Sequence, residues 1–295
     1  MSGSSVRTKP WELSDAVWER AEPLLPPHNP RVKGGRPPRD DREMLGAILF
    51  VLRTGIQWNA LPRAIGASTT VYDRFRAWER DGFFTRLWRA GVAEFDELVG
   101  IDWAWLAGDG AMTKAPFGVA ATAEAEGIGR NPTDRGKHGT KHGTKRRTLS
   151  EGHGLPLAVV IAGANRTDMK LLAATLDALI LARPTPTPEQ PQGVCLDKGY
   201  DYDYDTIRDQ LDARGYTPHI RPIGEDTAFA RSLDPSKQPR RWVVERLHSW
   251  LNRSRRLLVR WEKVKVTYQA FVHLACALLC FQQCDRYRAM SPVSE

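Results

Sequence analysis

The clearest helical pattern in the sequence runs from Arg240 to Lys263. Apolar side chains recur there every three or four residues and fall on one broad arc of a helix, as they do when a helix packs against a core. These side chains are Val243, Leu247, Trp250, Leu251, Leu257, Leu258 and Trp261. The pattern predicts one amphipathic helix over the whole stretch.

The polar face of this predicted helix carries one acid among many bases. Glu245 lies opposite the apolar arc, and the stretch holds seven Arg and only two Glu. Its neighbours on the helical wheel are Arg241, His248, Ser249, Asn252 and Arg256. A solvated face with i,i+4 ion pairs would explain the pattern. The excess of Arg also suits a surface that holds a polyanion beside a metal-binding carboxylate.

Short helical patterns fill the first third of the chain. After a tail over residues 1–12, a helix follows Ser14, and a Pro- and Gly-rich linker leads to further helices that run to residue 99. A turn at residues 62–67 is typical of a helix-turn-helix, whose second helix would carry residues toward DNA. These are Thr69, Thr70, Tyr72, Arg74 and Arg76. A plain helical bundle for packing or dimerisation predicts the same pattern, so both interpretations stay open.

After Gly100, strand-like apolar runs alternate with helical patterns, which predicts an α/β domain. The runs are WAWLAGDGAM, KRRTLS, GLPLAVVIAGA, QGVCLDKGY and TPHIRPI. The second and third leave no room for a crossover helix and predict a hairpin that turns at residues 152–154. We therefore expect an all-α, helix-turn-helix-like domain over residues 13–100. A mixed five-stranded sheet flanked by helices should follow over residues 101–287, and a tail over residues 288–295.

A basic, polar segment over residues 129–147 contains a KHGT repeat from Lys137 to Thr144. It offers no apolar side chains to bury, so we expect a mobile loop. Its bases Lys137, Lys141 and Lys145 are candidates for contact with DNA.

Charge narrows the class of partner. The net charge is +8 and the pI is near 9.5, so nucleic acid ranks above a membrane surface as the anionic partner. No apolar run approaches the ~20 residues that a membrane span needs, and the first residues lack the apolar core of a signal peptide. We expect a cytoplasmic protein.

Three of the four cysteines, Cys276, Cys280 and Cys284, recur every four residues along one helical pattern, and Cys195 stands alone. A thiolate metal site would need a further ligand, for which His273 is the nearest candidate in sequence. Small side chains on the buried face of a helix explain the spacing better.

Two acids follow apolar runs directly, Asp109 in LAGDGAM and Asp197 in VCLDKGY. Ligands and metals gather beyond the carboxyl ends of parallel strands, and neighbouring strands would bring the two carboxylates side by side. Glu245 could supply a third. Three oxygen ligands suit Mg²⁺, and two such ions can activate the attacking oxygen and stabilise the leaving oxygen in phosphoryl transfer. The pattern predicts a nuclease-like enzyme.

Other readings of these acids remain. Asp-Gly is also a turn signal, so Asp109 could be structural, and Asp197 could pair with Lys198. Three further acids lie just downstream, and we interpret them as charges that stabilise the start of the following helix. They are Asp201, Asp203 and Asp205.

Taken together, these segments resemble the DDE transposases of bacterial insertion sequences, in the group called IS-five. The resemblance rests on LAGDGAMTKAP, NPTDRGKHGTK, GLPLAVVIAGANRTD, LDKGYD and RRWVVERLHSWLNRSRRL, and it extends over nearly the whole chain. It implies a ribonuclease-H-like domain in which Asp109, Asp197 and Glu245 bind two Mg²⁺ or Mn²⁺. It also implies recognition of terminal inverted repeats in double-stranded DNA, hydrolysis that exposes 3′-hydroxyls, and attack of these on target DNA. Pairing of two ends implies a dimer or larger assembly, associated with the bacterial nucleoid.

The signature around the Glu helix is matched in part. Arg241 stands where the family has its Arg, but Gln238 replaces a Tyr, and Asn252 stands where Lys or Arg is expected, with Arg253 next to it. We expect Arg241, His248, Asn252, Arg253 and Arg256 to contact DNA. The interval of 48 residues between Asp197 and Glu245 (245 − 197) leaves no room for the inserted β-rich domain of some relatives.

Two rival functions remain open. One is a non-catalytic DNA-binding regulator, which carboxylates more than about 8 Å apart would favour. The other is a nuclease with the same core that acts on other DNA, which an absence of sequence preference would favour.

Overall fold

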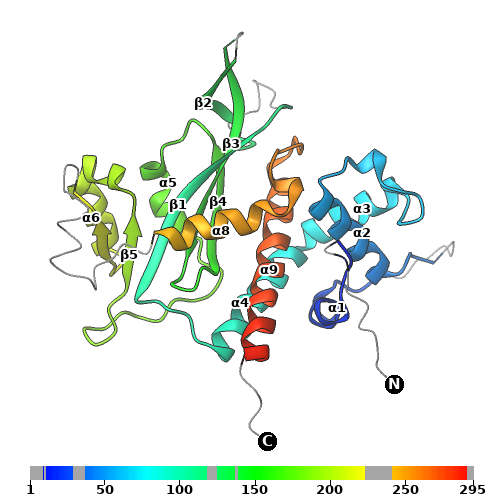
Figure 1. Cartoon of the computed structure of the whole chain (residues 1–295), viewed down its shortest axis with the longest axis horizontal. Coiled ribbons are helices and arrows are strands. Elements are labelled where there is room, and N and C mark those ends of the chain that lie inside the picture. Colours follow the sequence, from blue (N-terminus) through cyan, green and yellow to red (C-terminus); the bar gives the residue numbers. More distant parts are fainter. Residues whose placement is uncertain are drawn as a thin grey trace, which may run out of the picture.

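The structure, a computed structural model, describes residues 9, 11–28, 37–117, 125–136, 139–222 and 241–290 of the 295-residue chain. The first three helices, which end at residue 81, lie at one end of the molecule and the sheet lies at the other (Figure 1). The helices over residues 83–98 and 265–290 lie between them. The bounds of the N-terminal elements are α1 Asp15–Ala21, η1 Glu22–Leu24, α2 Asp41–Thr54, η2 Trp58–Ala60, α3 Ser68–Asp81 and α4 Phe83–Leu98.

The sequence marks the ends of these helices. The Ser14 hydroxyl accepts from the backbone N–H of Val17 at 3.3 Å, which confirms the predicted cap of α1. Asp40 caps α2 in the same way, accepting from the Glu43 N–H at 2.9 Å. Gly55 ends α2 with a φ of 72°, a backbone conformation that favours glycine. The predicted helical N-terminal region is therefore confirmed.

The sheet is mixed, as predicted. Its strands are β1 Trp105–Lys114, β2 Gly129–Gly136, β3 Gly139–Ser150, β4 Pro156–Gly163, β5 Gly193–Leu196 and β6 Thr217–Ile220. The order is β2-β3-β1-β5-β6, and β4 also pairs with β3. β1, β5 and β6 run parallel, whereas β3 is antiparallel to β1, β2 and β4. The expected hairpin of β3 and β4 is present, but β3 makes three antiparallel pairings rather than one.

The described part of the basic segment, residues 129–136 and 139–147, is strand rather than the expected loop. It forms β2 and most of β3, which pair from Gly129 and Gly143 to Gly136 and Gly139. The lack of apolar side chains does not exclude strands here, because backbone hydrogen bonds hold β2 and β3 together. Strand β2 is therefore an additional element that the apolar pattern does not show.

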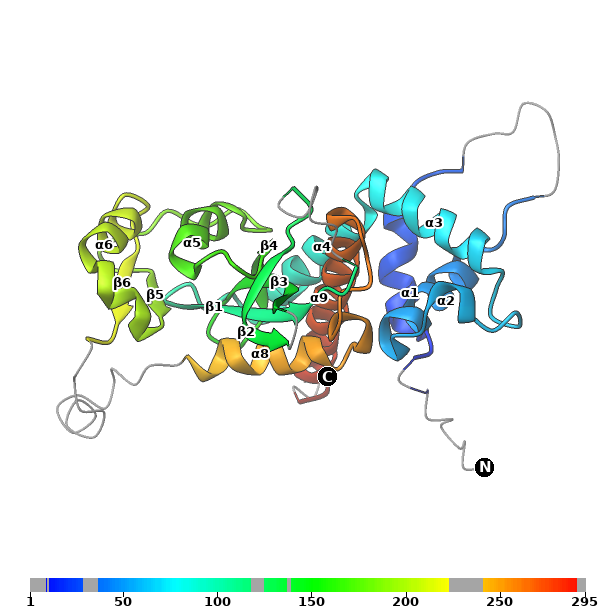
Figure 2. The same ribbon diagram turned by 90° about the horizontal axis from the view of Figure 1, so that it is seen from above.

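Helices cover the sheet. Their bounds are α5 Asp168–Asp177, η3 Lys198–Asp203, α6 Tyr204–Asp212, α8 Trp242–Asn252, η5 Arg255–Leu257 and α9 Lys265–Met290. Helix α8 crosses one face of the sheet over β1 and β3, and α5 lies on the opposite side (Figure 2). Helix α9 packs along α4 and joins the N-terminal helices to the sheet. This mixed sheet flanked by helices is the α/β arrangement that the sequence predicted.

The single long helix predicted from Arg240 to Lys263 is wrong in its second half. Helix α8 ends at Asn252, and Ser254 has extended backbone angles (φ −84°, ψ 95°). The chain then makes the short turn η5, which buries Leu257. Of the apolar residues after Asn252, Leu257 is buried in this turn and Leu258 is exposed, so they do not continue the apolar stripe of α8.

The four cysteines are free and buried, which confirms the predicted burial of Cys276, Cys280 and Cys284. His273 is also buried, where its Nδ1 atom lies 2.9 Å from the hydroxyl of Thr85. Among the helices of the described residues, none is long and apolar enough to cross a membrane.

Candidate active site

The pairing of β1 with β5 places Asp109 beside Asp197. The last parallel pair is Ala107 with Cys195, and each acid lies two residues further along the chain. Asp197 follows the end of β5, as predicted. Asp109, in contrast, is not at a strand end, because β1 continues to Lys114 in pairing with β3. The Asp-Gly pair at this position is therefore not a turn.

Arg241 joins these two acids to Glu245 on α8. Its Nη1 atom forms an ion pair with Asp197 Oδ1. Its Nη2 atom lies 3.5 Å from Glu245 Oε1 and 3.9 Å from Asp109 Oδ2. Arg241 directly precedes α8, and Glu245 is in the first turn of that helix. Three carboxylates from three separate elements thus meet at one guanidinium.

The three acids differ in their surroundings. The side chain of Asp109 is 23% exposed, against 44% for Asp197 and 57% for Glu245. Burial raises the pKa of Asp109, opposed by a hydrogen bond from the Gly110 backbone and by the charge of Arg241. A nearby cation would stabilise the charged form of this partly buried carboxylate.

On the face of the sheet turned to α8, a second set of polar side chains joins β3 to α8. Arg146, which is 1% exposed, donates from Nη2 to Asn252 Oδ1 at 2.6 Å. His248 lies 3.4 Å from the hydroxyl of Thr148. Burial, together with the charges of Arg146 and Arg147, lowers the pKa of His248 to about 3, so the ring is neutral near pH 7.

On the opposite face, Asp168 at the start of α5 approaches β1 and β3. Lys145 Nζ lies 2.8 Å from Asp168 Oδ2, and Arg147 Nη1 lies 4.0 Å from Asp168 Oδ1. The Arg147 guanidinium also lies over the ring of Tyr200. Lys145 was predicted only as a DNA contact, and Asp168 and Arg147 were not predicted as site residues; the segment GANRTD, which ends in Asp168, is part of the family resemblance only.

Several predicted DNA contacts are in the interior, contrary to expectation. His248 is 8% exposed, Lys145 is 6% exposed and paired with Asp168, and Arg256 is 4% exposed. Arg256 Nε lies 2.6 Å from Glu262 Oε1, because the chain leaves the helix after Asn252 and turns Arg256 inward. None of these three side chains can reach a phosphate in this conformation.

The remaining predicted DNA contacts differ in exposure. Arg253 and Lys141 are exposed. Arg74 is half-buried and paired with Asp41, and Arg76 is half-buried with Glu79 at 3.6 Å. Lys137 and Gln238 lie outside the described residues. Asn252 is half-buried and accepts a hydrogen bond from Arg146 of β3.

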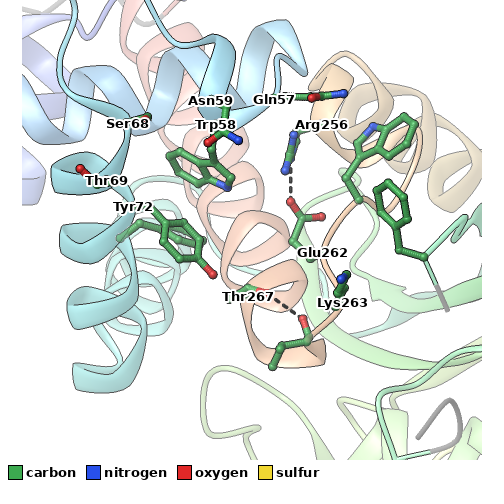
Figure 3. A pocket seen from close by; sticks show the side chains of 14 residues that line it. Gln57, Trp58, Asn59, Ser68, Thr69, Tyr72, Arg256, Glu262, Lys263 and Thr267 are labelled. Carbon is green, nitrogen blue, oxygen red and sulfur yellow. Dashed lines mark hydrogen bonds and ion pairs between the residues drawn. The ribbon is translucent and has the colours of Figure 1, made fainter. Parts of the chain in front are cut away.

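A separate open cavity of about 520 Å³ lies between α3 and the segment that leads into α9. Trp58 and Tyr72 line one side of it, and the ion pair of Arg256 with Glu262 borders it (Figure 3). None of the three acids lines this cavity. The candidate chemistry is therefore located on the sheet, away from this cavity.

Whether the three acids suit a metal follows from their chemistry. Within the residues that the structure describes, no three His, Cys, Asp or Glu side chains lie ready to hold an ion. Yet Asp109, Asp197 and Glu245 all lie within 4 Å of the same guanidinium, so they face one cationic point. Carboxylate oxygens are the ligands that Mg²⁺ and Mn²⁺ prefer. With Arg241 moved aside, the donor set fits a divalent ion.

Comparison with known proteins identifies the family of this chain. Residues 13–88 match the family model "Putative transposase of IS4/5 family (DUF4096)", and residues 119–280 match "Transposase DDE domain". The chain is 35% identical over 163 residues to "Putative transposase for insertion sequence element IS402" of Burkholderia cepacia, covering 54% of this chain and 70% of that protein. It is 34% identical over 124 residues to "Insertion element IS402 uncharacterized 16.2 kDa protein" of the same organism, covering 41% and 84%.

Among solved structures, a pre-cleavage Mos1 transpososome aligns over 85% of this chain and 81% of its own, with 12% identity and a TM-score of 0.28. The family assignment depends on the sequence matches. Because the transposase DDE model matches more than half of the 295 residues, the chain belongs to the DDE transposases of insertion sequences, enzymes that cleave DNA and transfer its strands.

Proposed function

We propose that Asp109, Asp197 and Glu245 are the catalytic acids of this transposase and that they hold two Mg²⁺ or Mn²⁺ ions. The observation that carries the proposal is their convergence on Arg241 from β1, the end of β5 and α8. Adjacent carboxylates repel one another, so an arrangement that gathers three of them needs a cation. Divalent metal dependence is what the DDE family implies.

The chemistry divides between the ions and the chain. Bound divalent ions would lower the pKa of a water or a 3′-hydroxyl and stabilise the leaving oxygen in phosphoryl transfer. The chain holds the acids at fixed positions and orients the DNA. His248 is not suited to take a proton from the nucleophile, because it is buried and its pKa is about 3.

We infer that double-stranded DNA lies over α8, because α8 carries Glu245 and leads to the exposed Arg253. Lys141 on β3 is a second exposed base for phosphate. Helix α3 would read the terminal inverted repeats through Thr69 and Thr70, which are exposed. Two element ends, each bound by one copy of the chain, would be paired by a homodimer or larger assembly on DNA.

The test uses duplexes that carry the DNA flanking this gene. The transposase should bind the duplex with the terminal repeat more tightly than a scrambled duplex of equal length, and cut it only with Mg²⁺ or Mn²⁺. Tight, specific binding without cleavage would instead identify a DNA-binding regulator. Cleavage without preference for the repeat would identify a nuclease that acts on other DNA.

A further inference from the structure

Arg241 occupies the point where the candidate metal ligands meet. Its guanidinium pairs with Asp197 and lies within 4 Å of Glu245 and of Asp109. One positive charge does not balance three carboxylates, so the cluster still attracts cations. Arg241 thus lowers the repulsion among the acids without removing it.

A divalent ion and the guanidinium compete for the same oxygens. Mg²⁺ binds carboxylate oxygens at about 2.0–2.1 Å, whereas a guanidinium N–H needs about 2.7–2.9 Å between its nitrogen and the oxygen. Both cannot lie among the three carboxylates at once. Metal binding therefore has to displace Arg241, and the free energy of the displaced ion pairs is lost from the metal affinity.

DNA offers the displaced guanidinium another anion. The side chain of Arg241 is 33% exposed and stands at the start of α8, so it can turn toward solvent. A phosphate accepts two parallel hydrogen bonds from a guanidinium, as a carboxylate does. A phosphate over α8 would thus take Arg241 at little cost in electrostatic energy.

We propose that Arg241 couples metal binding to DNA binding. Without DNA, it holds the three acids together and lowers their affinity for divalent ions; with DNA, it moves to a phosphate and leaves the acids to the metal. This inference rests on the proposed metal site of Asp109, Asp197 and Glu245. Because binding linkage is reciprocal, metal should also strengthen DNA binding.

The test measures Mn²⁺ affinity in the absence of DNA, by titration of the electron paramagnetic resonance signal of free Mn²⁺ near pH 8. Arg241→Gln should bind Mn²⁺ about 5- to 150-fold more tightly than wild type, the range typical of coupled sites. Arg241→Lys should stay near wild type, because an ammonium can still pair with the acids. Arg208→Gln removes the same charge from exposed α6 and should change nothing.

A second titration adds a saturating 30-base-pair duplex and subtracts the Mn²⁺ that the duplex binds alone. The affinity of wild type should then approach that of Arg241→Gln, whereas the variant should gain less from DNA. Misfolding of Arg241→Gln would not raise its affinity for Mn²⁺, so tighter binding by this variant would report the loss of the arginine.

Two outcomes separate the inference from the function beneath it. Equal or weaker Mn²⁺ binding by Arg241→Gln would overturn the coupling and leave the metal site intact. Unchanged Mn²⁺ binding by both Asp109→Asn and Asp197→Asn would show that the ion is not held by these acids, and would overturn the proposed site itself.

Discussion

The carboxylate of Asp168 lies against Gly110, the residue next to the candidate catalytic Asp109, so closely that a Cβ atom on Gly110 would overlap Asp168 Oδ1. Asp168 is held there by Lys145 at 2.8 Å. The two faces of β1 therefore make different contacts: Asp109 faces α8 and Arg241, whereas Gly110 leaves space for Asp168 of α5. Glycine is needed here for this close approach, not for a turn.

Gly110→Ala should accordingly destabilise the protein. The new methyl group forces Asp168 away from Lys145, and overpacking of this kind costs about 1–3 kcal/mol. The free energy of unfolding, measured by urea denaturation, should fall by that amount. Gly46→Ala is the matched control, because Gly46 lies in helix α2 and a Cβ atom there would meet only Leu13, at 3.9 Å. This variant should be as stable as wild type or more stable. An unchanged free energy of unfolding in Gly110→Ala would show that Asp168 can move aside without loss of stability.

The buried ion pair of Arg256 with Glu262 should be important for folding rather than for DNA. Glu262→Gln leaves a guanidinium buried without its charge partner, and such a loss costs about 3–5 kcal/mol. Unfolding of this variant should occur at clearly lower denaturant concentration. Glu97→Gln, on the exposed side of α4, makes the same chemical change and should alter stability by less than about 0.5 kcal/mol. Equal effects of the two variants would contradict the assigned role.

Stability should depend on pH through His273. Burial lowers its pKa to about 4, against about 6.5 in an unfolded chain. Between these values the unfolded state binds a proton that the folded state does not. Stability should therefore fall as pH drops through this window, by up to about 1.4 kcal/mol per pH unit for one such histidine. In His273→Gln, urea denaturation across the window should give a shallower fall; an unchanged slope would contradict the assignment.

Salt dependence tests the DNA surface beyond α8. Arg253 is exposed next to the helix that carries Glu245, so Arg253→Gln should lose one phosphate contact. The slope of log affinity against log salt should decrease in magnitude by about 0.9. Fluorescence anisotropy at several salt concentrations measures it. Arg208→Gln on α6 should keep the wild-type slope, and the same slope in both variants would place the DNA elsewhere.

The sequence predicted those parts of the site that depend on local pattern. Two apolar runs, each followed by an acid, were enough to expect parallel strands with Asp109 and Asp197 side by side, and β1 and β5 pair in that register. The helical period placed Glu245 on a helix, and α8 carries it. The assignment of Asp109, Asp197 and Glu245 as a catalytic set remains a prediction.

What the sequence did not show depends on partners far along the chain. Lys145 appears as a surface base until Asp168, on another element, is placed beside it. Arg146 is buried because α8 covers it, and Asn252 on that helix accepts its hydrogen bond. Arg256 lies on the polar arc only if the helix continues past Asn252. Such errors arise because charged residues are assumed to be exposed, although a paired arginine can be buried.

The central claim is that Asp109, Asp197 and Glu245 hold the ions that cut DNA. The most direct measurement follows the 3′-hydroxyl ends released from a labelled terminal-repeat duplex in Mg²⁺ or Mn²⁺. Asp109→Asn, Asp197→Asn and Glu245→Gln should each abolish cleavage while DNA binding survives, and chelation should do the same to wild type. Asp205→Asn, at an exposed acid of α6, should cut as wild type does. Cleavage at the wild-type rate by any of the three triad variants would contradict the claim.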